Sequence, residues 1–195
     1  MGFLGKIKRR HKKKVLFRQF KSVGLGTFEH VSSGVSFIGP EFCSLGSNAS
    51  IPAPASISCI DLRAEGSNFA PSLSIGNNFC ANTGFSVFCG LGIQIGDNCL
   101  FGPDVLIMDS DHGDAISDVP YQKQCRRSAK VLIGNNVYLG ARVVVLKGVT
   151  IGDNVIIGSN SVVTHDIPAN SKAGGIPAKV LRVWDAKTKT WIKPQ

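Results

Sequence analysis

The sequence lacks several features that would assign its class at once. No stretch of the 195 residues approaches the ~20 consecutive apolar residues that a membrane-spanning helix needs. No CxxC pair occurs among the six cysteines, so the usual spacing of a zinc site is missing and we expect no metal. Several cysteines stand where a small apolar residue would serve. We interpret them as reduced, buried thiols, which favours a cytoplasmic protein.

Acidic residues are missing from residues 1–21, which hold nine of the 22 Lys and Arg residues. The other 13 basic residues balance all 13 acids, so the net charge of +9 belongs to this segment. No apolar stretch long enough for a signal peptide follows the charges. Three interpretations stay open: a solvated arm, peripheral contact with an anionic membrane at its inner face, and nucleic-acid binding. The body shows no basic groove with stacking aromatics, so we expect no nucleic acid.

Aliphatic residues recur with a period of six. The clearest run, IGNNVY LGARVV VLKGVT IGDNVI IGSNSV VTHDIP, begins at Ile133, and shorter runs begin at Ile75 and Ile95. Six is a multiple of the strand period of two and is not a helical period, so the leading residues point to one side. Gly, Asn and Asp supply the turns. Hexapeptide repeats are typical of β-helices, in which these leading residues form interior ladders.

The repeat is interrupted between Ile95 and Ile133. Residues after Ile107 do not fit the interior pattern, so we predict an extruded loop over about 108–130. Loops of this length in compact domains are usually functional or disordered. The segment DSDHGD opens the loop and places His112 directly after a packed coil, on a rigid base.

The segments IGDNCLFGPDV, IGNNVYLG and VVTHDIPANSKAGGIPAKVLR resemble the hexapeptide acyltransferases. They are most similar to the maltose and galactoside O-acetyltransferases and to the sugar O-acetyltransferases of capsule and lipopolysaccharide pathways, over about Ile75 to Arg182. The resemblance implies an all-β, left-handed parallel β-helix, whereas parallel crossovers are generally right-handed. We expect a basic N-terminal tail (1–21), the β-helix domain (22–183) and a C-terminal tail (184–195).

The resemblance places the family's catalytic histidine at His112. A sugar hydroxyl hardly ionises at neutral pH, whereas a neutral imidazole can take its proton as the oxygen attacks a thioester, in a ternary complex without an acyl-enzyme. Asp109, Asp111 or a backbone carbonyl could orient the ring. Asn82 matches an asparagine that lines the acceptor pocket, where its amide could bind the hydroxyl or the oxyanion. A turn-forming role is the alternative for Asn82.

Acetyl-CoA is the co-substrate that the resemblance implies, bound in the groove between the β-helices of a homotrimer. Gly102 matches a backbone N–H near the thioester, and its missing side chain would admit a close approach. Lys179 and Arg182 match basic residues near the nucleotide phosphates. His165 replaces a family lysine, so that charge contact is not carried over. The other matching residues are Tyr138, Gly140, Gly158, Ser159 and Thr164.

The N-terminus departs from the maltose and galactoside enzymes, which begin with an acidic helical segment. A basic segment favours an acceptor held at a membrane over a free sugar, so we expect an O-acetyltransferase for a sugar hydroxyl in surface polysaccharide or lipopolysaccharide. The alternatives are an acetyltransferase for an amino sugar, serine or an antibiotic, and a non-catalytic trimeric scaffold. A γ-type carbonic anhydrase needs three zinc-binding histidines per site, a spacing that the four histidines here lack.

Overall fold

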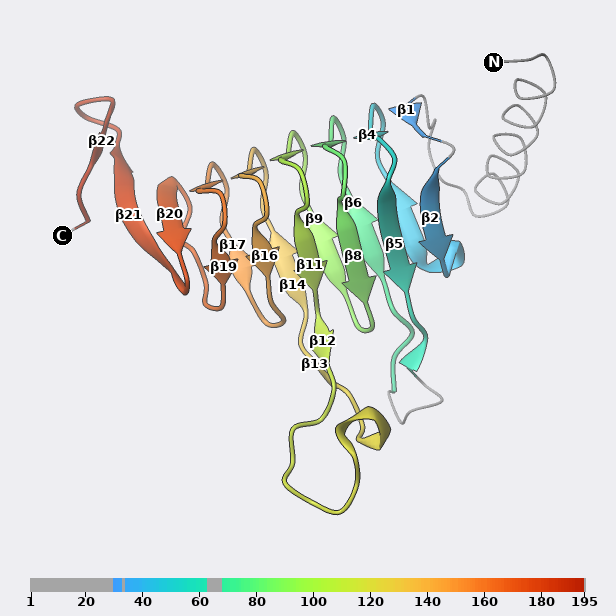
Figure 1. Ribbon diagram of the computed structural model, residues 1–195. Coiled ribbons are helices and arrows are strands. Elements are labelled where there is room, and N and C mark those ends of the chain that lie inside the picture. The colour runs from blue at the N-terminus through green and yellow to red at the C-terminus, as the bar shows by residue number, and fades with distance from the viewer. Residues whose placement is uncertain (1–29, 33, 63–67, 195) are drawn as a thin grey trace, which may run out of the picture.

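The computed structural model describes residues 30–32, 34–62 and 68–194. The basic segment 1–21 lies outside these residues. The described strands stack in successive coils (Figure 1), and the chain visits three sheets in turn before it repeats the circuit. This is the β-helix architecture that the period of six predicts, and the all-β fold is confirmed.

The sheets are named A, B and C in the order in which the chain visits them. Sheet A contains β1 (His30–Val31), β4 (Ser50–Ile51), β7 (Cys80–Ala81), β10 (Leu100–Phe101), β15 (Tyr138–Leu139), β18 (Ile156–Ile157), β20 (Ser171–Gly175), β21 (Ala178–Asp185) and β22 (Thr190–Ile192). Sheet B contains β2 (Val35–Ile38), β5 (Ala55–Cys59), β8 (Ser86–Cys89), β11 (Leu106–Met108), β16 (Val144–Val145) and β19 (Val162–Val163). Sheet C contains β3 (Cys43–Leu45), β6 (Leu73–Ile75), β9 (Ile93–Ile95), β14 (Val131–Ile133) and β17 (Thr150–Ile151).

Asparagines make the turn from sheet C to sheet A. Asn136 and Asn154 have φ values of 54° and 56°, in the left-handed region that asparagine tolerates better than most residues. Their side chains also form a ladder: the amide of Asn136 donates to Asn154 at 2.8 Å, and that of Asn154 donates to Asn170 at 3.0 Å. The asparagines of the IGNN and IGDN units at Ile133 and Ile151 therefore serve both the turn and the stacking of coils.

The leading residues fill the interior, as predicted. Those of the C-terminal run are at most 3% exposed: Ile133, Leu139, Val145, Ile151, Ile157 and Val163. A second row of buried residues lies two positions before the leading residues, and the period of six did not single it out. It includes Val131, Val137, Val143, Val149 and Val155. Closer to the N-terminus, Phe101 packs edge to face against Phe79 at 5.1 Å and against Phe85 at 5.8 Å between ring centroids, which is a favoured aromatic geometry.

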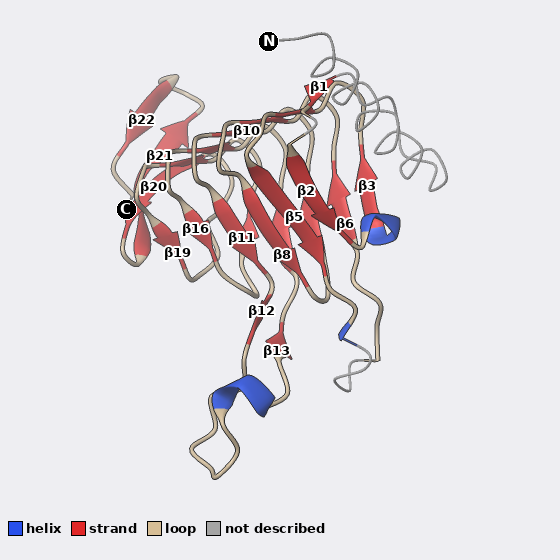
Figure 2. Ribbon diagram, turned by 45° about the vertical axis from the view of Figure 1, so that its right-hand side comes forward, coloured by secondary structure: helices blue, strands red, loops and turns tan. Residues whose placement is uncertain are grey.

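Extra residues enter the stack where the chain passes from sheet B to sheet C, which we call the B–C edge. In the regular coils Val163 follows its partner Val145 by 18 residues. Val87 follows Ile57 by 30, and Val145 follows Ile107 by 38. The longer insertion leaves the stack through a two-stranded stem, β12 (Ser110–Asp111) and β13 (Arg127–Ser128), and carries the 3₁₀ turn η3 (Tyr121–Lys123). Figure 2 shows the stem descending from the ends of the sheet B strands.

The stack ends in antiparallel strands. β20 pairs with β21, and β21 pairs with β22, so that Trp184 lies opposite Trp191 with ring centroids 5.3 Å apart. The residues from 184 onward, expected to form a C-terminal tail, therefore continue β21 and form β22. At the other end, the 3₁₀ turn η1 (Pro40–Phe42) connects β2 to β3.

The six cysteines are all free thiols. Cys43, Cys59, Cys89 and Cys99 are buried among the aliphatic residues, in keeping with their interpretation as small hydrophobes. The sulfurs of Cys43 and Cys59 lie 3.3 Å apart. Hydrogen bonds with Cys43 and Cys89, together with burial, raise the pKa of the Cys59 thiol. Within the described residues, no helix is long and apolar enough to cross a bilayer.

Candidate active site

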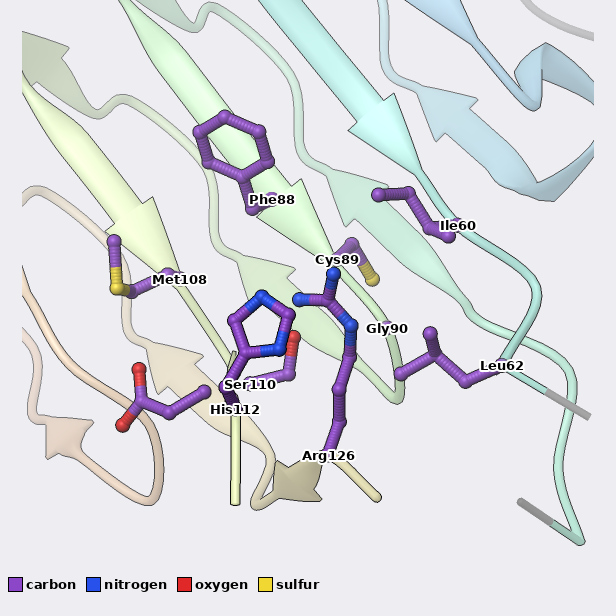
Figure 3. A pocket seen from close by; sticks show the side chains of 10 residues that line it. Ile60, Leu62, Phe88, Cys89, Gly90, Met108, Ser110, His112 and Arg126 are labelled. Carbon is purple, nitrogen blue, oxygen red and sulfur yellow. The ribbon is translucent and has the colours of Figure 1, made fainter. Parts of the chain in front are cut away.

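The insertions at the B–C edge build a pocket of about 230 Å³. Its walls come from the insertion after β5, from the ends of β8 and β11, and from the stem of the extruded segment. The walls are mainly apolar, and most of the polar side chains come from the stem. The pocket is lined by Ile60, Leu62, Phe88, Cys89, Gly90, Met108, Ser110, Asp111, His112 and Arg126 (Figure 3).

The stem holds His112 at this pocket. β12 and β13 pair so that Asp111 lies opposite Arg127. Lys147, on the B–C edge of the next coil, forms an ion pair with the Asp111 carboxylate. The stem is thus braced against the stack, and Figure 3 shows the imidazole of His112 projecting from it into the pocket. A side chain on such a base can be aimed at a substrate without first ordering a long loop.

Asp109 lies beneath the pocket and is 0% exposed. Its carboxylate accepts three backbone N–H groups, from Gly90 at 2.7 Å, Leu91 at 2.9 Å and Gly92 at 2.6 Å. These bonds hold the widened corner between β8 and β9, and Gly90 is part of the pocket wall. Both carboxylate oxygens are engaged there, so the contacts of Asp109 are those of a structural carboxylate, and its ring-orienting role stays a prediction.

Asp111, the other candidate for orienting the imidazole, lines the pocket, with 43% of its side chain exposed. Its Oδ2 is the atom that pairs with Lys147. The carboxylate therefore braces the stem on which His112 stands. The structure gives the two flanking aspartates structural contacts of different kinds, one in the corner and one between the stem and the next coil.

Several of the other predicted site residues stack at the opposite side of sheet B, where the chain passes from sheet A to sheet B. We call this the A–B edge. The register of sheet A aligns the ends of β7, β10, β15 and β18. The residues that follow these four strands form one column, which contains Asn82, Gly102, Gly140 and Gly158.

Hydrogen bonds between coils occupy this column. The side-chain amide of Asn82 donates to the carbonyl of Phe101 at 3.1 Å. The N–H of Gly102 donates to the carbonyl of Leu139 at 2.8 Å, so the ladder already uses the group that was predicted to lie near a thioester. The hydroxyl of Ser159 accepts the N–H of Ala141 at 3.1 Å.

Stacking also explains the glycines. A Cβ atom at Gly102 would lie 2.7 Å from the backbone nitrogen of Ala141, and one at Gly140 would lie 2.6 Å from that of Ser159. Both contacts are too close for real atoms, so these positions require glycine for the approach of neighbouring coils. At Gly158 the nearest atom would be 3.7 Å away, an ordinary contact.

The last predicted CoA-binding residues lie on the outer face of sheet A and near the C-terminus. Tyr138 lines a hollow of about 430 Å³ together with Trp184 and Trp191. Lys179 and Arg182 are exposed on β21. An aromatic hollow of this kind is suited to a planar ligand, and exposed cations are suited to an anionic one.

Apart from Tyr138, Lys179 and Arg182 on sheet A, the predicted residues of one chain form two groups, on either side of sheet B. His112 stands at the B–C edge, and so do Thr164 and His165, whose Oγ1 and Nδ1 atoms are 2.8 Å apart. The column that begins with Asn82 stands at the A–B edge. Asn82 therefore does not line the pocket of His112 in the same chain, although the sequence suggested that the two residues act together.

Sequence reasoning missed the walls of the pocket and one of its charges. Phe88 and Met108 were not singled out, because they are ordinary outward positions of sheet B strands. Arg126 and Lys147 were also missed. The segment QCRRSAK gives no periodic signal. Only the folded stem shows that Arg126 lines the pocket, whereas Arg127 pairs with Asp111 in the two-stranded ladder.

Comparisons with known proteins agree with this architecture. Residues 130–165 match the family described as bacterial transferase hexapeptide (six repeats), and residues 82–107 match the hexapeptide repeat of succinyl-transferase. A solved structure of a galactoside acetyltransferase in complex with coenzyme A is 30% identical, with a TM-score of 0.63, and the alignment covers 97% of this chain and 86% of that one.

Curated relatives show the same likeness. The galactoside O-acetyltransferase of Escherichia coli (strain K12) is 37% identical over 152 residues, which are 75% of this chain and 66% of that protein. The putative lipopolysaccharide biosynthesis O-acetyl transferase WbbJ of the same organism is 38% identical over 108 residues, which are 52% of this chain and 55% of that protein. The aligned region therefore leaves at least a third of the length of each of these two relatives uncovered.

Proposed function

The chain belongs to the hexapeptide-repeat acetyltransferases, and from this premise we propose that it transfers the acetyl group of acetyl-CoA to a sugar hydroxyl of surface polysaccharide or lipopolysaccharide. The observation that carries the proposal is the position of His112 on a braced stem, at a pocket that its side chain lines. The relatives named above act, by their names, on galactosides and in lipopolysaccharide biosynthesis.

In the proposed reaction His112 is the general base. The neutral imidazole accepts the proton of the sugar hydroxyl while the hydroxyl oxygen forms a bond to the acetyl carbonyl carbon. The carbon–sulfur bond then breaks, and the proton held by His112 passes to the departing sulfur. The products are the acetylated sugar and a free thiol, so atoms and charges balance without an acyl-enzyme. Phe88 and Met108 would pack against the acceptor and limit the access of water.

The acetyl donor needs a groove longer than this pocket, and two parts of the chain suit it. The glycine column at the A–B edge presents backbone with few side chains, so an extended pantetheine chain could lie against it. Lys179 and Arg182 on β21 could pair with nucleotide phosphates. Tyr138 would then lie against the ligand between these two regions.

A second copy of the chain would unite the two groups of residues. Because Asn82 and His112 stand at opposite edges of sheet B, the A–B edge of one copy must approach the B–C edge of another for both to act on one substrate. A closed ring of three β-helices meets this requirement at every interface, since each copy presents both edges. We therefore propose a homotrimer with its sites between subunits.

The test of acetyl transfer is thiol release from acetyl-CoA by the wild type and His112→Ala, with purified glycan fractions, neutral sugars, amino sugars and serine as acceptors. We expect a glycan fraction to stimulate release. The variant should lose about 10²–10⁴ in rate, because one general base is removed, while its affinity for CoA by calorimetry is retained. Near-normal turnover in His112→Ala would remove this residue from the mechanism, and an absence of both turnover and CoA binding in the wild type would favour the scaffold interpretation.

We also propose a cytoplasmic protein that touches the inner face of a membrane through residues 1–21. The proposal rests on the segregation of nine Lys and Arg residues into this segment, each of which contributes roughly 1 kcal/mol at an anionic surface. Deleting residues 1–14 should reduce cosedimentation with vesicles that contain anionic lipid and leave binding to neutral vesicles unchanged. Equal binding of the full chain and the deletion variant to anionic vesicles would support the interpretation of residues 1–21 as a solvated arm.

A further inference from the structure

A hollow of about 430 Å³ lies on the outer face of sheet A beside β21 and β22, at the C-terminal end of the stack (Figure 1). Its volume falls within the ~300–1,000 Å³ of typical ligand clefts. Trp184 and Trp191 line it, and they are the two tryptophans of the whole sequence. The other lining residues are Asn136, Tyr138, Asn154, Ile156 and Asn170.

The two indole rings are held in place before any ligand binds. The pairing of β21 with β22 sets Trp184 opposite Trp191, with ring centroids 5.3 Å apart and an interplanar angle of 66°. The ammonium of Lys172 lies 4.5 Å from the centroid of Trp191, which is a cation–π contact. Trp184 nevertheless remains 41% exposed, so it presents ring surface that a ligand can cover. A ring that is already positioned loses little conformational entropy when a ligand binds.

A column of amides supplies the polar lining of the hollow. Asn136, Asn154 and Asn170 stand in successive coils, and bonds of 2.8 and 3.0 Å join their side chains. An amide has two N–H donors and a carbonyl oxygen with two lone pairs, and each asparagine gives at most one of each kind to these bonds. All three residues are exposed. Because neighbouring strands lie roughly 4.8 Å apart, the column offers the same donors and acceptors repeatedly along the axis of the β-helix.

These groups match a neutral sugar chain. Among the described residues that line the hollow, none carries a charge at neutral pH, so a phosphate or carboxylate would find no counter-ion in the lining. The C–H groups of a pyranose ring can pack against the negative face of an aromatic ring. Hydroxyls both donate and accept hydrogen bonds, as the amides do. A repeating column of amides suits hydroxyls that recur along a chain, whereas a nucleotide base has its polar groups on its edges only.

We propose that the tryptophans of the terminal hairpin and the asparagine column form a second carbohydrate site, which holds a neutral sugar unit of the acceptor glycan. The inference rests on the glycan acceptor proposed above and deepens it. Tyr138, which the resemblance assigns to acetyl-CoA, is no part of the argument. A glycan chain held here is kept at a raised effective concentration near the pocket of His112, a gain that a single sugar unit does not share.

The experiment follows the fluorescence of Trp184 and Trp191, because the sequence contains no other tryptophan. Wild type, Trp184→Ala, Trp184→Phe and Tyr121→Ala are titrated with short oligosaccharides of galactose, glucose or mannose, and separately with coenzyme A. Trp191 remains as the reporter in the Trp184 variants. Tyr121→Ala is the matched control, since it removes an aromatic ring that is 61% exposed on the extruded segment and does not line the hollow. Circular dichroism shows whether each variant is folded.

We expect one series of oligosaccharides to change the emission saturably. Trp184→Ala should weaken this binding about 10-fold or more, through the loss of one aromatic contact. Trp184→Phe should retain part of the affinity, and Tyr121→Ala should bind as the wild type does. In the thiol-release assay, Trp184→Ala should raise the KM for a glycan polymer and leave the KM for acetyl-CoA unchanged.

Two results would overturn the inference. One is an emission that no neutral oligosaccharide changes. The other is a folded Trp184→Ala that loses affinity for coenzyme A and not for sugar, which would assign the hollow to the nucleotide. A failure of thiol release with every acceptor would overturn the proposed function, whereas the titration decides the sugar site separately because it needs no acetyl transfer.

Discussion

Asp109 and Asp111 flank Ser110 in the sequence, but they differ in burial and in the groups that they contact. Asp109 is fully buried and accepts three N–H groups from the corner at Gly90–Gly92. Asp111 reaches the surface and pairs with Lys147. Carboxylates so close to the proposed general base suggest a triad, but here backbone donors bind Asp109, and Lys147 pairs with Oδ2 of Asp111. Both residues therefore support the corner and the stem that position His112.

Asp109→Asn should destabilise the fold. The amide keeps one acceptor oxygen but turns an N–H₂ group toward backbone donors, so at least one buried N–H loses its partner. We expect the free energy of unfolding in urea to fall by about 2–4 kcal/mol, from the loss of charge-assisted bonds and an unsatisfied donor. Asp118→Asn, at an exposed position of the extruded segment, is the matched control and should change stability by less than ~0.5 kcal/mol. Equal stability of the two variants would mean that Asp109 does not hold the corner.

At the scale of elements, the edges of the β-helix differ in whether they accept inserted residues. The A–B edge is built from glycines that let neighbouring coils approach, whereas the B–C edge accepts insertions of different lengths. An insertion at an edge extends outward and leaves the ladders of leading residues intact. The pocket forms at the permissive edge because the insertions of successive coils lie above one another there.

A pair of glycine substitutions tests the stacking argument. Gly140→Ala would bring a methyl group 2.6 Å from the backbone of Ser159, whereas Gly158→Ala, in the same column, meets its nearest atom at 3.7 Å. We expect thermal and urea unfolding to show a loss of about 1–3 kcal/mol for Gly140→Ala, the usual cost of overpacking, and little change for Gly158→Ala. Similar values for both variants would contradict the view that coil spacing dictates glycine at 140.

The interior of the β-helix could be predicted from the sequence. A fixed period of six gives every leading residue, such as Ile133, the same inward position as the next. The place of the insertion followed from the point where that period stopped. The pocket wall did not follow, since Arg126 comes to line the pocket of His112 only through the pairing of the stem strands, and no periodicity encodes that pairing. Gly102 was assigned to the acetyl donor because it matches a family backbone N–H near the thioester, and the close approach of the neighbouring coil is by itself a reason for glycine at this position.

At the scale of the whole molecule, residues of the proposed site lie on both sides of sheet B in a single chain. His112 with its pocket stands at one edge, and the column of Asn82 stands at the other. The outward positions of sheet B between them include Phe88, which is 42% exposed. A second copy that covers this face would bury apolar surface and bring the two groups of residues together in one step.

The central claim is that His112 of one copy and Asn82 of another act on the same acetyl transfer. The most direct measurement is thiol release by mixed oligomers of His112→Ala and Asn82→Ala, coexpressed with different tags and purified through both. Each variant alone should be nearly inactive. In a mixed trimer one interface in three pairs an intact His112 with an intact Asn82, so we expect roughly one third of the wild-type rate. Mixed oligomers no more active than the separate variants would show that both side chains act within one chain, and would contradict the account.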